Sequence, residues 1–442
     1  MNDAESPTAL GTPRVRRPRG VPRWWPARVY YGWAMVVTLG VTATVSYGTL
    51  LYAFAVFITP MSTELGWSKS EITGAFSVAQ LVAGVTAVPL GRWVDRHGAR
   101  GVMTAGSLLA AALLVCWARV QSLAFFYVVW VLFGVASAAV LYEPAFAVIA
   151  TWFRRDRGRA LTALTFIGGF ASVVFVPLAT LLVDRCGWRE ALLWLAAIYA
   201  VFTIVPHALV LRRRPADLGL EPDGRVVTAL DRGSSPPLGA HERQVPNRGV
   251  AARDAIRSRA FRWLTVAFAL SALTTTAISV HLVPLLLERG YEAGFAGAAM
   301  GVLGLMALPG RLVFTPLGGR WPRTAVTALI FALSAVAIGV LLAGHGAISV
   351  WVFVLLFGAG FGAITPARAA LLAETFGVTS YGEISGVLAV VLSMARAAAP
   401  IGASVLHETS RTLPVAGYDA VLVVLIVFAI GSTAAVIAGR SA

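Results

Sequence analysis

The sequence predicts an all-α membrane protein in which twelve transmembrane helices form two six-helix bundles. Three observations predict this fold class. The 442 residues are 58% hydrophobic and only 13% charged, which is about half the charged share of soluble domains. The apolar residues form runs long enough to cross a bilayer as helices, and features of the first half return in the second. The charged residues, which give a net charge of +15, lie mostly between the apolar runs. The composition therefore excludes a soluble enzyme, a disordered chain and a nucleic-acid binder.

The predicted spans are helices because of their length. A helix needs roughly 20 residues to cross about 30 Å of hydrocarbon. Transmembrane strands would need about 9–11 residues of alternating polarity, and these runs have neither feature. The twelve spans are predicted near residues 32–58, 70–92, 101–120, 122–150, 158–183, 190–211, 262–287, 293–316, 324–343, 348–372, 382–406 and 414–438.

Both ends of the chain are predicted to lie in the cytoplasm, from the distribution of arginine and lysine. With that orientation the inner segments hold 27 basic residues and the outer segments six, and basic residues accumulate on the cytoplasmic side of membrane proteins. Residues 1–28 form an Arg- and Pro-rich tail with no apolar core, so we expect no cleavable signal peptide. Arginine outnumbers lysine 35 to one, a usage typical of GC-rich genomes. We therefore expect a multi-pass protein of a bacterial plasma membrane.

The spans divide the chain into four regions. A cytoplasmic tail (1–28) precedes the first bundle (29–211), and a cytoplasmic linker (212–261) leads to the second bundle (262–439). In the linker the apolar pattern stops and Arg, Gly, Pro and Ser dominate, which is typical of a solvated tether. A short amphipathic helix is expected near residues 250–260.

The two bundles are predicted to be copies of one six-helix unit. Three sequence features recur in the same topological places at nearly one offset. Such duplication is typical of transporters, which bind substrate between the halves near the bilayer midplane. The pairs are Phe133-Gly134 with Phe357-Gly358 and Gly158 with Gly382, both offset by 224, and Pro89-Leu90-Gly91 plus Arg96 with Pro316-Leu317-Gly318 plus Arg323, offset by 227.

The segment GRWVDRHGAR at residues 91–100 carries a family resemblance. It resembles the G-x-x-x-D-R-x-G-R loop of the major facilitator superfamily, with Ala99 as one extra residue, and it follows the second span as in that family. The resemblance implies the major facilitator fold over residues 30–440 and a gating role for Gly91, Asp95 and Arg96. Asp95 would face the amino end of the eleventh helix, where a carboxylate is favoured by the helix dipole. In the second copy Pro322 replaces the acid, so any latch is one-sided.

Finer features resemble the monocarboxylate transporters and the bacterial oxalate:formate antiporters. They are YGW at 31–33, LGWSKSE at 65–71, WFRR at 152–155 and GWR at 187–189. Ser68 and Glu71 also form a predicted capping box. Two positions depart from the animal monocarboxylate transporters: Leu51 stands at the place of a first-helix Lys, and Ala307 at the place of an eighth-helix Asp. The resemblance therefore does not imply proton coupling through that Lys–Asp pair.

Four charges fall well inside predicted spans: Glu143, Arg311, Arg368 and Arg396. Each costs roughly 2.5–3.5 kcal/mol at the bilayer centre unless it has a polar cavity or a partner. Their surplus of positive charge is complementary to an anion, and arginine binds carboxylates through a planar fork. In the antiporters that this chain resembles, basic residues on the eighth and eleventh helices hold substrate carboxylates. This favours Arg311 and Arg396 as substrate-binding residues, the alternative being helix braces bonded to backbone carbonyls.

Further candidates are weighed against structural roles. Glu143 and Arg368 lie at similar depth in pseudo-equivalent helices, so they form an ion pair between the halves, a proton site, or a static salt bridge. His281 is a candidate for proton coupling because histidine is the side chain that most readily changes charge near neutral pH, and the alternative is a histidine satisfied by a neighbouring hydroxyl. Tyr47, Gln80 and Tyr142 are candidate hydrogen-bonding groups for a ligand, or ordinary packing residues.

Together these features predict a secondary active transporter of small organic anions, mono- or dicarboxylates, working by alternating access with proton symport or anion exchange. The alternatives are an efflux transporter of drug-like compounds and a non-transporting membrane sensor. Because the sequence contains no Walker, H-E-x-x-H, C-x-x-C or G-x-S-x-G motif, we expect no enzyme activity, cofactor or metal. The expected partners are a small anionic substrate, protons and the lipid bilayer, with no nucleic acid, for a monomeric protein.

Overall fold

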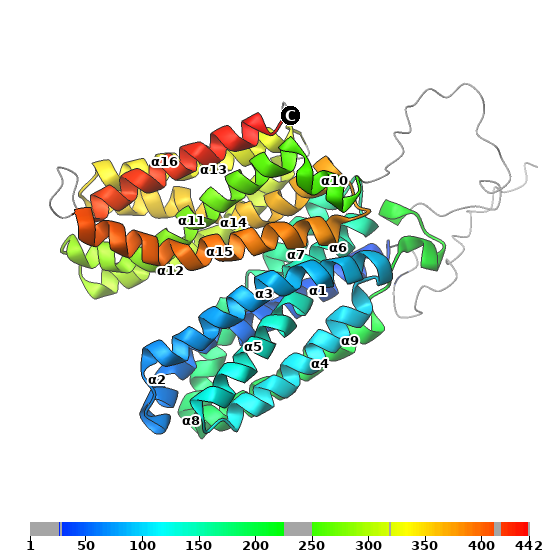
Figure 1. Cartoon of the computed structure of the whole chain (residues 1–442), viewed down its shortest axis with the longest axis horizontal. Coiled ribbons are helices and arrows are strands. Elements are labelled where there is room, and N and C mark those ends of the chain that lie inside the picture. The colour runs from blue at the N-terminus through cyan, green and yellow to red at the C-terminus, as the bar shows by residue number, and fades with distance from the viewer. Residues whose placement is uncertain (1–25, 27–28, 225–249, 318–319, 411–416, 441–442) are drawn as a thin grey trace, which may run out of the picture.

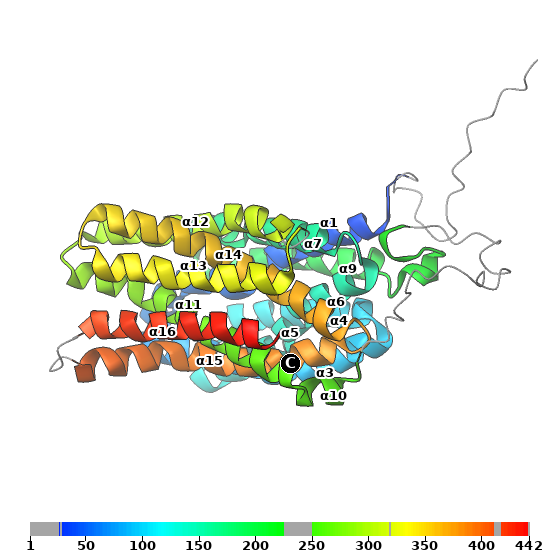
Figure 2. The same ribbon diagram turned by 90° about the horizontal axis from the view of Figure 1, so that it is seen from above.

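The fold is that of a computed structural model, which describes residues 26, 29–224, 250–317, 320–410 and 417–440. Nearly all of the predicted tail and the middle of the predicted linker, residues 225–249, lie outside the described residues. The described part of the chain is helical and contains no strand. Figures 1 and 2 show its helices running along the long axis of the molecule in two bundles. The predicted all-α class is confirmed.

Helices α1 to α9 build the first bundle. Eleven helical stretches of the described chain are long and apolar enough to span a membrane, and the stretch Arg157–Leu209 contains a non-helical Gly187 with φ 78°. Both ends of that stretch lie beside the linker, so it turns back at Gly187 and makes two spans. The elements are α1 (Gly32–Tyr47), η1 (Gly48–Tyr52), α2 (Phe54–Leu65), α3 (Lys69–His97), α4 (Ala99–Ala118), α5 (Leu123–Val140), α6 (Tyr142–Trp152), α7 (Arg157–Gly168), α8 (Ala171–Tyr199), η2 (Ala200–Ile204) and α9 (Val205–Leu209).

Helices α11 to α16 build the second bundle, in which each span is one continuous helix. The elements are α11 (Arg259–Glu288), α12 (Ala293–Leu317), α13 (Arg323–Ala343), α14 (Ala347–Phe376), α15 (Tyr381–Thr409) and α16 (Gly417–Ala438). With the first bundle they give the twelve spans that hydropathy predicts. The short helix expected near residues 250–260 is α10 (Ala252–Arg257).

The first bundle differs from the second because its spans are interrupted. The π-helical segments η1 and η2 break the first and sixth spans, and a non-helical Leu141 separates α5 from α6. Pro144 explains this last break, because it has no N–H to bond the carbonyl of Val140. Irregular backbone at membrane depth is tolerated where it is buried in protein or lines a cavity.

The second span extends further than hydropathy predicts. Helix α3 continues through Arg92 and Asp95 to His97, and only Gly98, with φ 83°, forms the turn to α4. The prediction that residues 91–100 form a loop was therefore wrong. Polar residues remain helical beyond an apolar run when the backbone bonds continue, so the charged side chains of this segment occupy defined positions on a helix face.

Two of the motifs that carry the finer resemblance, at residues 65–71 and 187–189, make hydrogen bonds at the end of the first bundle away from the linker. Trp188 and Arg189 both donate to the Glu64 carboxylate, at 2.5 and 2.9 Å. The predicted capping box is confirmed, because Ser68 and Glu71 exchange side-chain to backbone bonds at 3.1 and 2.8 Å. These motifs therefore have structural roles.

The linker begins as part of the first bundle rather than as a free tether. Leu218 and Leu220 are buried there, and the Arg213 guanidinium donates to the carbonyl of Arg96. At its other end the Val250 amide donates to the carbonyl of Phe376 in α14. We call this end of the molecule, where residues 211–224 and α10 lie, the linker end. Figure 1 shows the two bundles meeting at the linker end and diverging at the other.

Candidate functional site

A cavity of about 520 Å³ lies between the two bundles and contains all four charges that the sequence places inside spans. The first bundle contributes tyrosines, glycines and Glu143, whereas the second contributes three arginines, hydroxyl groups and an apolar wall. The lining residues are Tyr47, Tyr52, Tyr142, Glu143, Gly168, Gly169, Ser172, Phe268, Ser271, Ala272, Thr275, Thr276, Ser279, Met300, Leu303, Gly304, Ala307, Leu308, Arg311, Phe361, Ile364, Thr365, Arg368, Leu392 and Arg396.

Glu143 and Arg368 form an ion pair that joins the bundles. The Arg368 Nη2 lies 2.6 Å from Glu143 Oε1, and the Ser385 hydroxyl donates to the other carboxylate oxygen. Glu143 belongs to α6, whereas its two partners belong to α14 and α15. Since Arg368 is buried, the pair neutralises one positive charge of the cavity. This geometry is the ion pair between the halves that was one of the predicted alternatives.

Arg311 is held by backbone carbonyls from both bundles. Its Nε donates to the carbonyl of Gly362 in α14 at 3.1 Å, and its Nη1 donates to the carbonyl of Thr165 in α7. A side chain at Gly169 would collide with Nη1, so the glycine at the end of α7 permits this approach. The described geometry therefore corresponds to the bracing alternative for Arg311.

Arg396 is the arginine of the cavity whose guanidinium has no hydrogen bond or ion pair with the described residues. It is an exposed residue on α15 and lines the cavity. Arg368, Tyr47 and Glu143 are close enough to interact with it electrostatically. Once Glu143 has neutralised Arg368, the cavity keeps the charges of Arg311 and Arg396. Both are complementary to an anion.

Two tyrosines of the first bundle lie near these arginines. The rings of Tyr47 and Tyr142 are 4.5 Å apart, and Tyr142 also stacks on Phe146 at 5.1 Å. Tyr47 lies near Arg396, whereas Tyr142 and Tyr52 lie near Arg311. Both tyrosines that the sequence singles out for ligand binding are therefore placed in the cavity.

Two predicted ligand-binding residues are not placed at the cavity. Gln80, on α3, is not among the lining residues. His281 is also absent from the lining, and its ring nitrogens lie 3.2 Å from the Tyr418 hydroxyl and 3.1 Å from the Pro400 carbonyl. A neighbouring hydroxyl satisfies this histidine, as its structural alternative predicts. Its partners come from segments more than 100 residues away.

Part of the lining was not predicted from the sequence. Thr275 and Thr276 of α11 face the cavity together with Phe268 and Phe361. The run Thr274-Thr275-Thr276 was a signal for these hydroxyls, but it is equally typical of helix packing. Aromatic residues in apolar spans carry no signal that separates a cavity wall from a lipid-facing surface.

The bundles also meet at the linker end, between α3 and α15. Asp95 accepts from the backbone N–H groups of Gly382 at 2.8 Å and Glu383 at 2.9 Å. A side chain at Gly91 would collide with the Gly382 backbone, so two glycines allow the helices to touch. Asp95 thus lies where the family resemblance implies.

A second ionic contact at this seam was missed. Arg92 pairs with Glu383 at 2.8 Å, whereas the guanidinium of Arg96 has no partner among the described residues. The spacing carried a signal for this pair, because Arg92 lies one helical turn before Asp95 and Glu383 follows Gly382.

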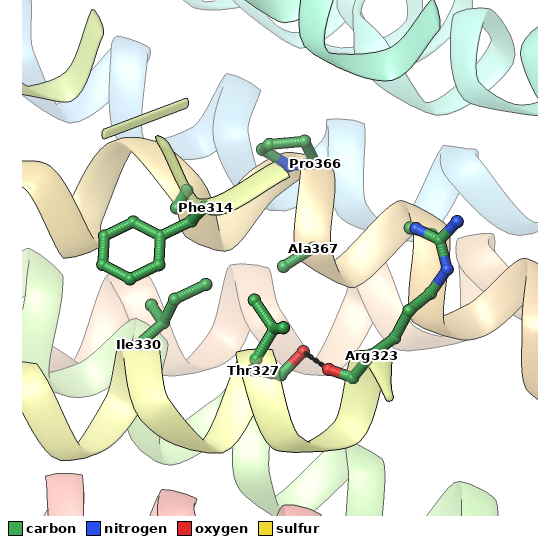
Figure 3. Close-up of a pocket in the computed structure, with 9 residues that line it drawn as sticks. Phe314, Arg323, Thr327, Ile330, Pro366 and Ala367 are labelled. Atoms are coloured by element: carbon green, nitrogen blue, oxygen red, sulfur yellow. Dashed lines mark hydrogen bonds between the residues drawn. The ribbon is translucent and has the colours of Figure 1, made fainter. Parts of the chain in front are cut away.

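A smaller cavity inside the second bundle does not compete as a substrate site. It lies among α12, α13 and α14 and measures about 20 Å³, room for about one water molecule. Figure 3 shows Phe314, Ile330 and Pro366 around it, with Arg323 at its edge. Arg323 pairs with Glu374 at 2.7 Å, so its charge is already matched.

Comparisons with known proteins establish the family. The model of the Major Facilitator Superfamily matches residues 40–400. The chain belongs to this superfamily. The chain is 24% identical to monocarboxylate transporter 13 of Bos taurus, over 78% of this chain and 76% of that protein. It is 29% identical to the uncharacterized transporter YybO of Bacillus subtilis (strain 168), but that match covers only 43% of this chain and 41% of the relative.

Solved structures show the same fold. A bacterial homologue of the iron transporter ferroportin, in an outward-facing state, superposes with a TM-score of 0.70 at 15% sequence identity, covering 94% of this chain and 100% of that one. The chain is therefore a multi-pass membrane transporter of the major facilitator superfamily, which moves small molecules across a membrane. The expectation that it is not an enzyme agrees with these relatives.

Proposed function

We propose that this protein is a secondary active transporter of small organic anions, mono- or dicarboxylates, that works by alternating access. The observation that supports this function is the cavity charge. Glu143 neutralises Arg368 at 2.6 Å, which leaves Arg311 and Arg396 as a positive surplus in a site between the two halves. Arginine stays charged at any physiological pH and binds carboxylates strongly. Relatives named as monocarboxylate transporters fit this substrate class.

The arrangement of the bundles supports alternating access. The bundles touch at the linker end through Asp95, Arg92 and Glu383 and diverge at the other end (Figure 1). The distribution of basic residues predicts that the linker and both termini lie in the cytoplasm. The described state is then outward-facing, with the cavity closed to the cytoplasm of a bacterial cell.

Efflux of drug-like compounds is the weaker alternative. A cavity for cationic drugs needs an unpaired acid, whereas the acid of this lining, Glu143, is already bonded to Arg368 and Ser385. A non-transporting sensor would bind the anion without moving it. Flux measurements separate these functions.

The test is flux into proteoliposomes of labelled lactate, oxalate and a cationic dye. We expect uptake of at least one anion, no dye transport, and loss of anion flux in the double variant Arg311→Ala/Arg396→Ala. Arg119→Gln, at an outer helix end, is the matched control and should keep wild-type flux. Dye transport without anion flux would establish the efflux alternative, and anion binding without flux would establish the sensor.

Coupling depends on whether Glu143 takes up a proton when Arg368 moves away. Glu143→Gln should remove the pH dependence of uptake if transport is proton symport through this carboxylate. If uptake depends on pH equally in the variant, Glu143 is only an ion-pair partner. If wild-type uptake needs an anion on the opposite side instead of a pH gradient, the protein is an exchanger.

The proposed topology has its own test. A tag inserted after Gly233 should react with reagents only when cells are opened, because the linker is cytoplasmic. Labelling of that tag in intact cells would contradict the orientation. The proposed monomeric state is checked by the mass of the purified protein in detergent.

A further inference from the structure

We propose that the substrate is a monocarboxylate with a bulky apolar body, and that Arg396 binds its carboxylate while Arg311 braces the two bundles. This inference rests on the proposed function and assigns different roles to two arginines that sequence analysis treated alike. It is carried by the hydrogen bonds of the arginines, the hydroxyl groups of α11 and the apolar wall of the second bundle.

The three arginines of the cavity differ in how many of their N–H groups are free to bind a substrate. Arg368 is paired with Glu143 at 2.6 Å, and Arg311 has its Nε and Nη1 committed to the carbonyls of Gly362 and Thr165. Arg396 alone offers its whole planar fork among the described arginines of the cavity. One open fork holds one carboxylate in a bidentate manner. Tyr47, which lies beside Arg396 and lines the cavity, offers a hydroxyl to the same carboxylate.

Two hydroxyl groups that α11 presents to the cavity are already used as donors within the helix. On α11 the hydroxyl of Thr275 donates to the carbonyl of Ser271 at 2.9 Å, and that of Ser279 donates to the carbonyl of Thr275 at 2.8 Å. Their protons are therefore used within the helix. A second carboxylate placed against Thr275 and Ser279 would meet their oxygen lone pairs, so these two residues do not form a second carboxylate site as Arg396 and Tyr47 do.

The cavity also has an apolar wall, which can contact the body of a substrate. The second bundle lines the cavity with large apolar side chains from four helices, and a cavity of about 520 Å³ falls within the 300–1,000 Å³ typical of sites for drug-sized ligands. Oxalate and lactate have too little apolar surface to cover such a wall. An aryl or branched-chain acid buries its body there and gains hydrophobic free energy. The wall residues are Phe268, Met300, Leu303, Leu308, Phe361 and Leu392.

Arg311 lies where it contacts both bundles. Thr165 belongs to the first bundle and Gly362 to the second, so the Arg311 guanidinium bonds both. The bundles must separate there when the linker end opens, which breaks the bond to Thr165. Arg311 therefore acts on the conformational equilibrium, and its substitution should change turnover more than substrate affinity.

The first experiment measures binding of phenylpyruvate, 4-methyl-2-oxopentanoate, lactate, oxalate and malonate to the purified full-length protein by titration calorimetry. We expect the two larger acids to bind at least about tenfold more tightly than the others, the scale of one buried apolar side chain. Phe361→Ala should weaken phenylpyruvate binding by about tenfold and leave lactate binding within about twofold. Phe125→Ala, an exposed phenylalanine on α5, is the matched control.

The second experiment separates the two arginines. Arg396→Lys should weaken binding of every acid by about tenfold or more, because it keeps the charge and loses the fork. Arg311→Lys should keep binding within about threefold and change the maximal rate of uptake instead. Unchanged melting temperatures without ligand would show that both variants are folded. Equal losses of affinity in the two variants would overturn the division of roles.

The outcomes distinguish this inference from the proposed function. If oxalate or malonate binds as tightly as phenylpyruvate, the apolar monocarboxylate is wrong while an organic-anion transporter stands. If no anion of the panel binds or is transported, the proposed function itself fails. If Phe361→Ala weakens lactate and phenylpyruvate equally, the wall does not select the substrate body.

Discussion

The amino ends of α15 and α7 are equivalent in the repeat, yet they are capped from different parts of the molecule. Gly382 at the start of α15 corresponds to Gly158 at the start of α7, at the offset of 224. Asp95 of the opposite bundle accepts two backbone N–H groups at α15. Before α7, a linker residue of the same bundle, Asp223, accepts three, from residues 154, 155 and 156 at 2.9–3.3 Å.

The missing acid of the second copy accounts for this difference. Pro322 stands where the first copy has Asp95, so α13 begins without a carboxylate to offer across the interface. The linker supplies one through Asp223, whose φ of 64° makes it the sole non-glycine residue with positive φ in the described chain. Such backbone strain persists when surrounding bonds determine the conformation. The cap of α15 therefore joins the two bundles and would be lost if they separated at the linker end, whereas the cap before α7 lies within one bundle.

The helix contacts beside the two caps differ in the same way. At the α3–α15 seam, backbones touch, because side chains at Gly382 and Gly386 would collide with the backbone of α3. At the α7–α12 seam, contact is made by the long side chain of Arg311. A backbone contact tolerates no added atom, whereas a flexible side chain can move aside. Substitutions at the first seam should therefore have the larger effect on the conformational equilibrium.

The largest effect is expected from Gly91→Val. Its added carbons meet the backbone of Gly382, which has no rotamer with which to avoid them, so the closed linker end should be destabilised by about 3 kcal/mol or more. A cysteine replacing Met300 in the cavity, in a variant without the two native cysteines, should then lose labelling by an impermeant thiol reagent added opposite the linker. Gly101→Val is the control, since nothing lies within 4 Å of its added Cβ.

Asp95→Asn should have the next largest effect. It removes the charge that accepts two backbone N–H bonds, worth about 1.5–3 kcal/mol, and so shifts the ratio of the two states by roughly one to two powers of ten. Uptake should fall while substrate binding remains measurable. The exposed Asp184→Asn serves as control. Wild-type turnover in Asp95→Asn would mean that this helix cap does not act on the conformational equilibrium.

Asp223→Asn tests the cap before α7. It should lower the stability of the first bundle by about 1–2 kcal/mol, because one oxygen acceptor is replaced by a donor that faces N–H groups. The melting temperature should fall by a few degrees, and the thiol labelling of the cavity should be unchanged. A labelling change as large as that of Asp95→Asn would contradict the distinction between the two caps.

The smallest effect is expected from Arg92→Gln. The Arg92 side chain is 54% exposed, and exposed ion pairs contribute less than about 1 kcal/mol. The labelling ratio should change by less than about fivefold, and less at high salt than at low salt. An effect larger than that of Asp95→Asn would place the latch on the ion pair instead of the helix cap.

The repeat explains which parts of the site were predictable. Glu143 and Arg368 were expected at similar depth because residue 367 is the repeat partner of Glu143, and the pair is confirmed at 2.6 Å. Arg311 and Arg396 were expected in one cavity because the resembled antiporters carry basic residues on the same two helices, and both arginines line the cavity. Depth along a helix follows from counting residues at 1.5 Å each. The direction in which a side chain points and its partners do not.

The sequence by itself determined the spans, the two-bundle repeat, the four charges at membrane depth and the position of Asp95. These features depend on local hydropathy, on helical hydrogen bonds between residues close in sequence, and on a contiguous motif. The tertiary structure alone decided that Arg311 is bonded and Arg396 open, that His281 is satisfied by Tyr418, and that Asp223 caps the turn before α7. The partners in each case lie 51 to 146 residues apart in the chain. Only the packing of whole helices brings such segments within hydrogen-bond distance. No local sequence pattern indicates which of two similar arginines will lie beside a backbone carbonyl.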